Sequence, residues 1–213
     1  MTLSSLDRAG FVQSFSLSAT VAARFDVYHQ RLVQWQKVQN LVAPATLADV
    51  WRRHFADSAQ LLPLLDGPKQ LVDMGSGAGF PGLVLALLQE SSDCTVHLIE
   101  ANGRKCAFLK DVVRATGVNV EIHNCRIEEF ANRSTIADID VVTARALKPL
   151  PQLLDLGAFA FSNGAVGVFL KGKTYAQELQ EAREAWSFEV LEVSSQTDAE
   201  GRIVKLSEVK PKV

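Results

Sequence analysis

The sequence predicts an α/β fold with a doubly wound, largely parallel sheet of seven strands, preceded by a helical segment. Three observations support this prediction. From residue 70 onward, apolar runs of strand length alternate with amphipathic stretches of helix length. Before that point, apolar residues recur at the three- and four-residue spacings of helices. A turn signal at residues 66–69 separates the two parts, so we expect a helical segment over 1–66 packed on a core domain over 67–213.

The composition is typical of a globular protein in a reducing compartment. Of the 213 residues, 47% are hydrophobic and 22% are charged, and the formal net charge is −2. This total does not exclude nucleic acid as a partner, because binding depends on local patches. The three cysteines lack paired metal spacing and the four histidines are scattered, so we expect buried thiols and no metal site. No stretch resembles a secretion signal or a membrane span, which predicts a cytoplasmic protein without membrane contact.

The N-terminal segment is predicted to contain two main helices. Five apolar residues share one face of the first helix: Val21, Phe25, Tyr28, Leu32 and Trp35. Thr46 and Asp49 resemble the capping residues of the second helix. In that helix Arg52 and Arg53 lie about one turn from Asp57, which favours a solvated face with ion pairs. A small basic surface that faces RNA is the alternative.

The core domain is predicted to alternate strands and helices. The five leading strands are expected at residues 70–73, 95–99, 118–123, 139–143 and 165–170. The clearest helices are expected at residues 83–88, 103–116, 150–161 and 176–186. Two final strands at 188–194 and 202–209 flank a turn and predict a hairpin, so that one edge strand should be antiparallel.

Residues 70–82 are the most informative stretch, because an apolar run ending in Asp73 leads directly into a glycine-rich turn. Glycine allows positive φ angles and the close approach of a ligand. Pro81 is expected near the first position of the next helix, whose free N–H groups would face that ligand. The stretch therefore predicts a nucleotide-type site formed with three alternating glycines, Gly75, Gly77 and Gly79.

Two classes of ligand compete for this site. The spacing of Gly77, Gly79 and Gly82 matches the dinucleotide fingerprint of NAD(P)-dependent oxidoreductases. Asp73 favours the other class, because a carboxylate beside the turn would repel a pyrophosphate and attract a cation. S-adenosylmethionine carries an ammonium and a sulfonium and no phosphate. We therefore favour S-adenosylmethionine.

Further candidates follow the ends of later strands, where ligands of such sheets bind. Glu100 ends the second strand and could accept hydrogen bonds from ribose hydroxyls. After the third strand, the Glu128 carboxylate and a backbone N–H could bind the edge of an adenine while Ile127 packs on its face. The alternative is an ordinary helix start, where the helix dipole favours acidic residues.

Basic residues follow the fourth and fifth strands. Arg145 either anchors a loop or meets an anion, and we favour contact with a ligand or RNA. Lys148, Lys171 and Lys173 are expected at the same rim, which predicts a phosphate-binding lip. Arg145 and Lys171 are also candidates for positioning the reactants.

Several of these motifs together resemble the RsmG family, formerly called glucose-inhibited division protein B. The resemblance rests on residues 73–82, 102–105, 108–109, 126–129, 143–146 and 171–173, and on 35–41 and 53–58 upstream. It implies a Rossmann-like class I methyltransferase fold and transfer of a methyl group from S-adenosylmethionine to N7 of a guanine in 16S ribosomal RNA. The cofactor contacts that it implies are Gly75, Phe80, Ile127, Glu128 and Arg145. Two positions depart from the family pattern. Val42 follows Leu41 where the family commonly has threonine, and Glu100-Ala101 replaces a common Asp-Ser pair.

The implied chemistry agrees with the residue types present. Guanine N7 has a lone pair and no proton to remove, so no general base is needed, and the sequence shows no Ser/His or Cys/His constellation. The enzyme must position the two reactants, with Phe80 as an aromatic wall for an unstacked base. The implied partner is 16S rRNA in the small ribosomal subunit or an assembly intermediate, and we expect a monomer. An oxidoreductase and a non-catalytic RNA-binding protein remain as alternatives.

Overall fold

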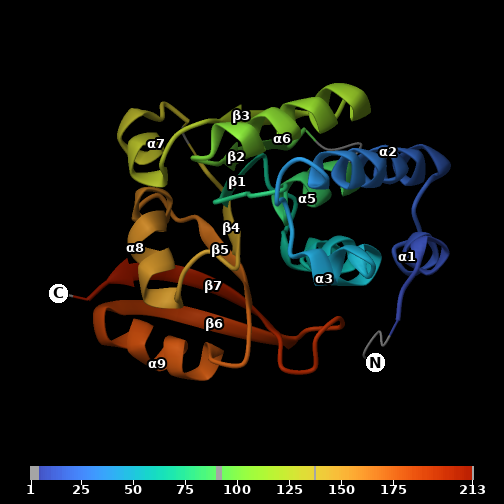
Figure 1. The fold of residues 1–213 in the computed structure, drawn as a ribbon. Coiled ribbons are helices and arrows are strands. Elements are labelled where there is room, and N and C mark those ends of the chain that lie inside the picture. Colours follow the sequence, from blue (N-terminus) through green and yellow to red (C-terminus); the bar gives the residue numbers. More distant parts are fainter. Residues whose placement is uncertain (1–4, 90–92, 137, 213) are drawn as a thin grey trace.

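The computed structural model describes residues 5–89, 93–136 and 138–212, and a seven-stranded sheet lies at its centre (Figure 1). The strand order is β3-β2-β1-β4-β5-β7-β6. The strands are β1 (Gln70–Met74), β2 (Thr95–Ile99), β3 (Val120–His123), β4 (Val141–Arg145), β5 (Val166–Lys171), β6 (Trp186–Ser194) and β7 (Arg202–Pro211). Strands β1 to β5 pair in parallel, whereas β7 is antiparallel to both β5 and β6. The predicted fold class and the antiparallel last strand are confirmed.

The expected position of the antiparallel strand at the sheet edge is wrong. The β6–β7 hairpin folds back so that β7 lies between β5 and β6, and β6 is the edge strand. The apolar residues explain this order. Ile203 and Val204 of β7 are buried beside β5, whereas Leu191 of β6 is 52% exposed. An edge position leaves one side of a strand unpaired, which suits the more polar β6.

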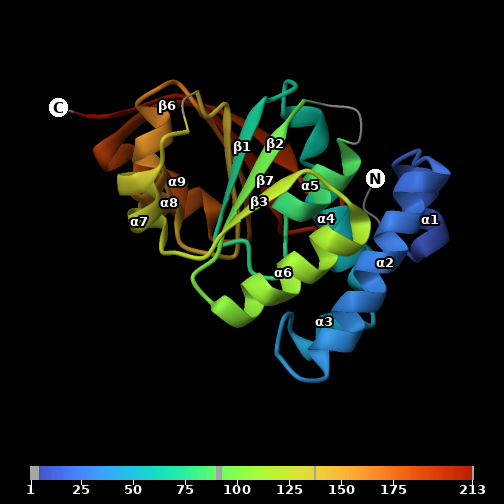
Figure 2. The same ribbon diagram turned by 90° about the horizontal axis from the view of Figure 1, so that it is seen from above.

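Two layers of helices cover the sheet, as Figures 1 and 2 show. The helices of the core domain are α5 (Gly82–Leu88), α6 (Gly103–Thr116), α7 (Ile127–Arg133), α8 (Leu150–Phe161) and α9 (Tyr175–Ala185). Helices α5 and α6 share one hydrophobic core with the N-terminal helices, and α7, α8 and α9 contribute to a second core on the opposite face. Successive strand residues alternate between the two cores, as Leu71 and Val72 do, because side chains alternate across a strand.

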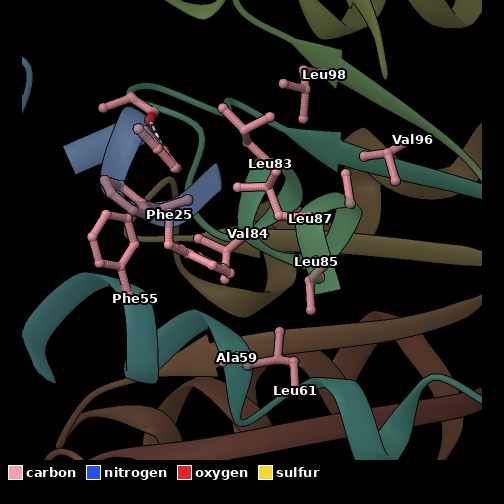
Figure 3. Packing of buried hydrophobic residues seen from close by; sticks show 14 of the residues in the cluster. Phe25, Phe55, Ala59, Leu61, Leu83, Val84, Leu85, Leu87, Val96 and Leu98 are labelled. Atoms are coloured by element: carbon pink, nitrogen blue, oxygen red, sulfur yellow. Dashed lines mark hydrogen bonds between the residues drawn. The ribbon is translucent and has the colours of Figure 1, made fainter. Parts of the chain in front are cut away.

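The N-terminal helices pack against α5 and α6. They are α1 (Arg8–Ser14), α2 (Ala19–Gln36), α3 (Pro44–Leu47), the π-helical turn η1 (Trp51–Ala56), α4 (Asp57–Ala59) and the 3₁₀ turn η2 (Leu62–Leu64). The predicted apolar stripe on α2 is confirmed: its first four residues are buried, and Trp35 donates a hydrogen bond to Asp111 on α6 at 3.0 Å. Figure 3 shows the core that results, with Phe55 of η1 and Leu98 of β2 on opposite sides of α5.

The predicted cap at Thr46 and Asp49 is wrong, whereas Pro81 lies next to the first position of its helix, as expected. Thr46 lies inside α3, and its hydroxyl is 2.8 Å from His54 Nε2 instead of capping a helix. Asp49 pairs with Arg52. Pro81 occupies the position before α5, which begins at Gly82.

Within the described residues, no helix combines the length and the apolarity that crossing a membrane requires.

Candidate active site

The glycine turn after β1 adopts the conformation that its sequence predicts. Gly75, Gly77 and Gly79 have φ angles of 68°, 59° and 92°, a region that other residues rarely adopt. The turn is also closely packed. A Cβ on Gly79 would lie 2.6 Å from the hydroxyl of Tyr28 and 2.8 Å from Cβ of Leu83. Glycine is therefore needed at this position for both backbone conformation and space.

Asp73 lies beneath the turn and does not line the cavity that is described below. It is completely buried, and its two carboxylate oxygens accept hydrogen bonds from the Gly82 N–H and the Thr143 hydroxyl, each at 3.1 Å. Burial raises the pKa of Asp73 to about 6. Both oxygens are thus bonded within the protein, and the attraction between this carboxylate and a cationic ligand stays a prediction. Asp73 connects the first residue of α5 to β4.

A cavity of about 390 Å³ opens above the glycine turn, and we call it the glycine-loop pocket. Five sequence-predicted residues line it: Gly75, Gly77, Glu100, Ile127 and Glu128. They come from the ends of β1 and β2 and from the start of α7, as expected for the carboxyl ends of parallel strands. Lys148 lines the pocket as well, although it was expected at an RNA-binding lip. Three expected cofactor contacts besides Asp73 do not line it: Gly79, Phe80 and Arg145.

Glu100 couples the pocket to the turn. Its Oε2 accepts a hydrogen bond from the Gly77 N–H at 2.9 Å, and its Oε1 accepts one from the Asn102 N–H at 2.7 Å. Each carboxylate oxygen has two lone pairs, so the group retains acceptor capacity for a ligand. The predicted hydrogen bond to a ribose is compatible with this geometry.

A second cavity of about 330 Å³ adjoins the first, and we call it the arginine pocket. Its lining includes Arg53, Asp57 and Arg145, and it shares Ala146 with the glycine-loop pocket. Ala146 has a φ angle of 52°, which is uncommon for alanine. Strained backbone of this kind concentrates at functional sites. The chain thus turns sharply at the residue that separates the two cavities.

Arg145 anchors the N-terminal segment to the sheet. Its guanidinium donates to the Arg53 carbonyl at 3.0 Å, to Asp57 Oδ2 at 3.2 Å and to His54 Nδ1 at 2.9 Å. The guanidinium also lies 4.9 Å from the ring centroid of Phe80. The alternative in which Arg145 anchors a loop is therefore realised, and the same side chain lines the arginine pocket.

His54 is a buried, neutral partner in this network. Burial and the nearby cations Arg145 and Arg53 lower its pKa to about 3. Because a guanidinium only donates, Nδ1 of His54 is the acceptor and its proton resides on Nε2, which lies 2.8 Å from the Thr46 hydroxyl. The ring stacks on Phe80 with centroids 4.9 Å apart. Phe80 is therefore covered by His54 and Arg145, so it does not form an open wall for a base.

Comparison with known proteins identifies the family. The family model described as "GidB: rRNA small subunit methyltransferase G" matches residues 22–205. The chain belongs to this family. A relative named "Ribosomal RNA small subunit methyltransferase G" from Methylorubrum populi is 44% identical over 208 residues, which cover 96% of this chain and 98% of the relative. A protein with the same name from Rhodospirillum centenum is 46% identical, with 95% of this chain and 91% of that protein covered.

Solved structures confirm the class of fold. An O-methyltransferase from Bacillus cereus in complex with S-adenosylhomocysteine superposes with a TM-score of 0.58 at 14% identity, over 84% of this chain and 90% of that one. A tRNA (m1A58) methyltransferase from Aquifex aeolicus gives a TM-score of 0.55 at 18% identity, over 73% and 69% of the two chains. This chain therefore has the Rossmann-like class I methyltransferase fold.

The predicted lip of four cations is only partly present in this family member. Lys171 forms an ion pair with Glu178, donates to the Lys148 carbonyl at 3.0 Å, and has a side chain that is only 8% exposed. Its charge is therefore neutralised within the protein. Lys148 and Lys173 are exposed near the end of β4 and after β5. Arg145 is paired with Asp57, as described above.

The predicted solvated face with ion pairs around Arg52 and Arg53 is only partly present, because both side chains form ion pairs and are partly exposed but also contact the loop before β7. Arg52 donates to the Thr197 carbonyl at 2.8 Å, and Arg53 lies 3.3 Å from Asp198. His54, in the same helical turn, is buried. The part that Arg53 plays in the arginine pocket could have been inferred from the motif at residues 53–58, which carries part of the family resemblance.

Proposed function

We propose that this protein transfers a methyl group from S-adenosylmethionine to N7 of a guanine in 16S rRNA, within the small ribosomal subunit or an assembly intermediate. The observation that carries the proposal is the pair of pockets that meet at Ala146. The glycine-loop pocket offers the Glu100 and Glu128 carboxylates and the apolar Ile127 to an adenosine, and the arginine pocket beside it is lined by paired charges of both signs, among them Arg145 and Asp57. The names of the relatives support rRNA as the acceptor.

The backbone of the turn supports S-adenosylmethionine over a dinucleotide. A dinucleotide fold leaves turn N–H groups free to bind the pyrophosphate. Here the N–H of Ser76 donates to the Ile99 carbonyl, that of Gly77 to Glu100 and that of Gly82 to Asp73. These donors are already used by protein acceptors, including two carboxyl groups. A ligand without phosphate fits this turn better than a diphosphate.

In the glycine-loop pocket, Glu100 would bind the ribose hydroxyls of the cofactor. Ile127 would pack on the adenine, and Glu128 would accept from its amino group. The reactive methyl group would then point across Ala146 toward the arginine pocket, where the acceptor guanine would bind. Such a placement brings the two reactants into line, which is the main task of an enzyme for this reaction.

The arginine pocket is suited to a reaction that needs no base. The sulfonium loses its methyl group to the N7 lone pair, and the positive charge passes to the guanine ring. The pKa of about 3 keeps His54 neutral, and its Nδ1 already accepts from Arg145. Arg145 positions this end of the site by joining β4 to the N-terminal segment, and Phe80 supports it from below. The transfer itself involves no metal in this proposal.

The rim of the pockets supplies the RNA contacts in this proposal. Arg53, Lys148 and Lys173 remain available to phosphates, because each is at least partly exposed. With rRNA as the substrate, we propose that the protein acts in the cytoplasm, as a monomer.

The test is transfer of tritiated methyl groups from S-adenosylmethionine to free 16S rRNA and to small ribosomal subunits, followed by mapping of the labelled nucleotide. We expect label at N7 of a single guanine. Absence of label in both substrates despite cofactor binding would favour a non-catalytic RNA-binding protein. Tight binding of NADH instead of S-adenosylmethionine would favour an oxidoreductase.

A further inference from the structure

Three metal-binding side chains meet at the β2–β3 edge of the sheet, although they are far apart in the sequence. The parallel register pairs His97 with Glu121 and Ile99 with His123. Residues two apart on a strand point to the same face, so His123 lies next to Glu121 on that face. His97 Nδ1 is 3.1 Å from His123 Nε2 and 3.5 Å from Glu121 Oε2, and the last two atoms are 3.8 Å apart.

These three separations, from 3.1 to 3.8 Å, bracket the ligand spacing of a zinc site. At zinc–ligand distances of 2.0 to 2.2 Å, the ligand atoms of a tetrahedral site lie about 3.3 to 3.6 Å apart. A point about 2.0 Å from all three atoms exists between His97 Nδ1, His123 Nε2 and Glu121 Oε2. The ligand set of two histidines and one carboxylate is one that zinc uses with a fourth position left open.

Gln70 holds the buried His97 in the orientation that a metal ligand needs. His97 is only 3% exposed, and its Nε2 lies 2.7 Å from Gln70 Oε1. An amide oxygen only accepts, so the proton of the neutral ring is on Nε2 and the lone pair of Nδ1 faces the cluster. Histidines that bind metals are held by this kind of second hydrogen bond.

The cluster also has an access route. A cavity of about 390 Å³ is lined by Glu121, His123 and Cys125 among others, and the Glu121 side chain is 59% exposed. A water molecule in this cavity can supply a fourth ligand. The backbone after the cluster leads to the glycine-loop pocket, because the Glu100 N–H donates to the His123 carbonyl at 3.1 Å and Cys125 lines both cavities.

We propose that His97, Glu121 and His123 form a zinc site that joins the edge strand β3 to β2 and keeps an open fourth position toward the cavity. The expectation of no metal site considered only the spacing along the chain, whereas the parallel register brings the ligands together. Strand β3 has no fully buried residue among its four, so a metal cross-link would stabilise the edge that carries the adenine end of the pocket. The site is separate from the methyl-transfer chemistry proposed above.

The test uses the full chain after chelator treatment, titrated with Zn²⁺ in a calorimeter and with Co²⁺ as a spectroscopic probe. We expect one Zn²⁺ per chain, a rise of several degrees in the midpoint of thermal unfolding, and the intense visible bands of tetrahedral Co²⁺ without a thiolate charge-transfer band. Glu121→Gln removes an exposed ligand with little change in shape, and it should weaken Zn²⁺ binding at least tenfold. His123→Asn should do the same.

The matched control is His29→Asn, because His29 is a partly buried histidine that packs on Trp51, away from the cluster. This variant should bind Zn²⁺ as the parent does. Three outcomes would overturn the proposal: no stoichiometric Zn²⁺ binding, unchanged affinity in Glu121→Gln and His123→Asn, or a Co²⁺–thiolate band that shows binding through cysteine. If no Zn²⁺ binds, His97 and His123 form only a hydrogen bond with each other.

Discussion

The glycine-loop pocket and the arginine pocket share Ala146 but draw on different parts of the chain. The first is built mainly at the carboxyl ends of neighbouring parallel strands, and the positive-φ glycines Gly75 and Gly77 form part of its wall. The second joins η1, the end of β4 and the loop before β7, so that residues 145 positions apart, Arg53 and Asp198, lie side by side. The first pocket therefore depends in part on the local conformation of the glycine turn, whereas the second depends on ion pairs and hydrogen bonds between distant parts of the chain.

The largest expected effect on stability comes from a substitution that the glycine turn cannot accommodate. Gly79→Ala should lower the free energy of unfolding by about 3 to 4 kcal/mol, because alanine is strained at positive φ and its Cβ would meet Tyr28 and Leu83. Gly67→Ala is the matched control. Gly67 has a φ angle of 65° and no atom near its missing Cβ, so this variant should cost only about 1 kcal/mol. Equal losses in urea unfolding would contradict the packing argument.

The next effect concerns the buried carboxyl beneath the turn. Burial raises the pKa of Asp73 from 3.8 to about 6. Between about pH 4 and pH 6 the folded protein therefore binds this proton more tightly than the unfolded chain, so the Asp73 contribution to stability falls as the pH rises, by about 3 kcal/mol in total.

Asp73→Asn should remove this fall, since an amide can still accept from Gly82 and bond with Thr143. The measurement is urea unfolding of both proteins across the window from about pH 4 to pH 7. The pKa of His54, lowered to about 3, contributes the opposite slope in both proteins, so the difference between them isolates Asp73. Parallel curves would show that the Asp73 pKa is not raised.

A smaller effect is expected for the carboxylate that joins the turn to the pocket. Glu100→Gln should raise the Kd of S-adenosylmethionine about tenfold, because an NH₂ group would replace one of two acceptors and the negative charge would be lost. Glu192→Gln, on the exposed edge strand β6, should leave the Kd unchanged. A normal Kd for Glu100→Gln would remove Glu100 from the cofactor site.

The smallest effects separate exposed lysines from the paired one. Lys148→Ala or Lys173→Ala should each lower the salt dependence of RNA binding by about 0.7 to 0.9 in the log–log slope. Lys171→Met should leave the slope unchanged and lower stability, because its charge already pairs with Glu178. Binding titrations at several salt concentrations check this. A reduced slope for Lys171→Met would return Lys171 to the RNA surface.

This contrast explains what could be predicted from the sequence. Helix α6, helix α8 and the glycine turn follow from local patterns, and the helix ends and positive φ angles agree with them. The residues that line the glycine-loop pocket could be predicted because the carboxyl ends of parallel strands meet at one edge of the sheet.

The contacts of the buried charged residues and the position of β7 could not be predicted, because they depend on residues that are distant in the sequence. Arg145 meets Asp57 and His54 only because the N-terminal segment folds over β4. Lys171 is neutralised by a residue of the following helix, and β7 lies inside the sheet because its apolar residues bury beside β5. Charge and spacing identify candidates, but the partner of each buried charge is a tertiary property.

The most direct test of the division between the two pockets is Arg145→Lys, with the Kd of S-adenosylmethionine and the rate of methyl transfer to 16S rRNA measured on the same preparation. Lysine keeps the charge but loses most of the hydrogen bonds to Arg53, His54 and Asp57. We expect a Kd within about twofold of the parent value and a rate about a hundredfold lower. A large rise in Kd with an unchanged rate would contradict the account.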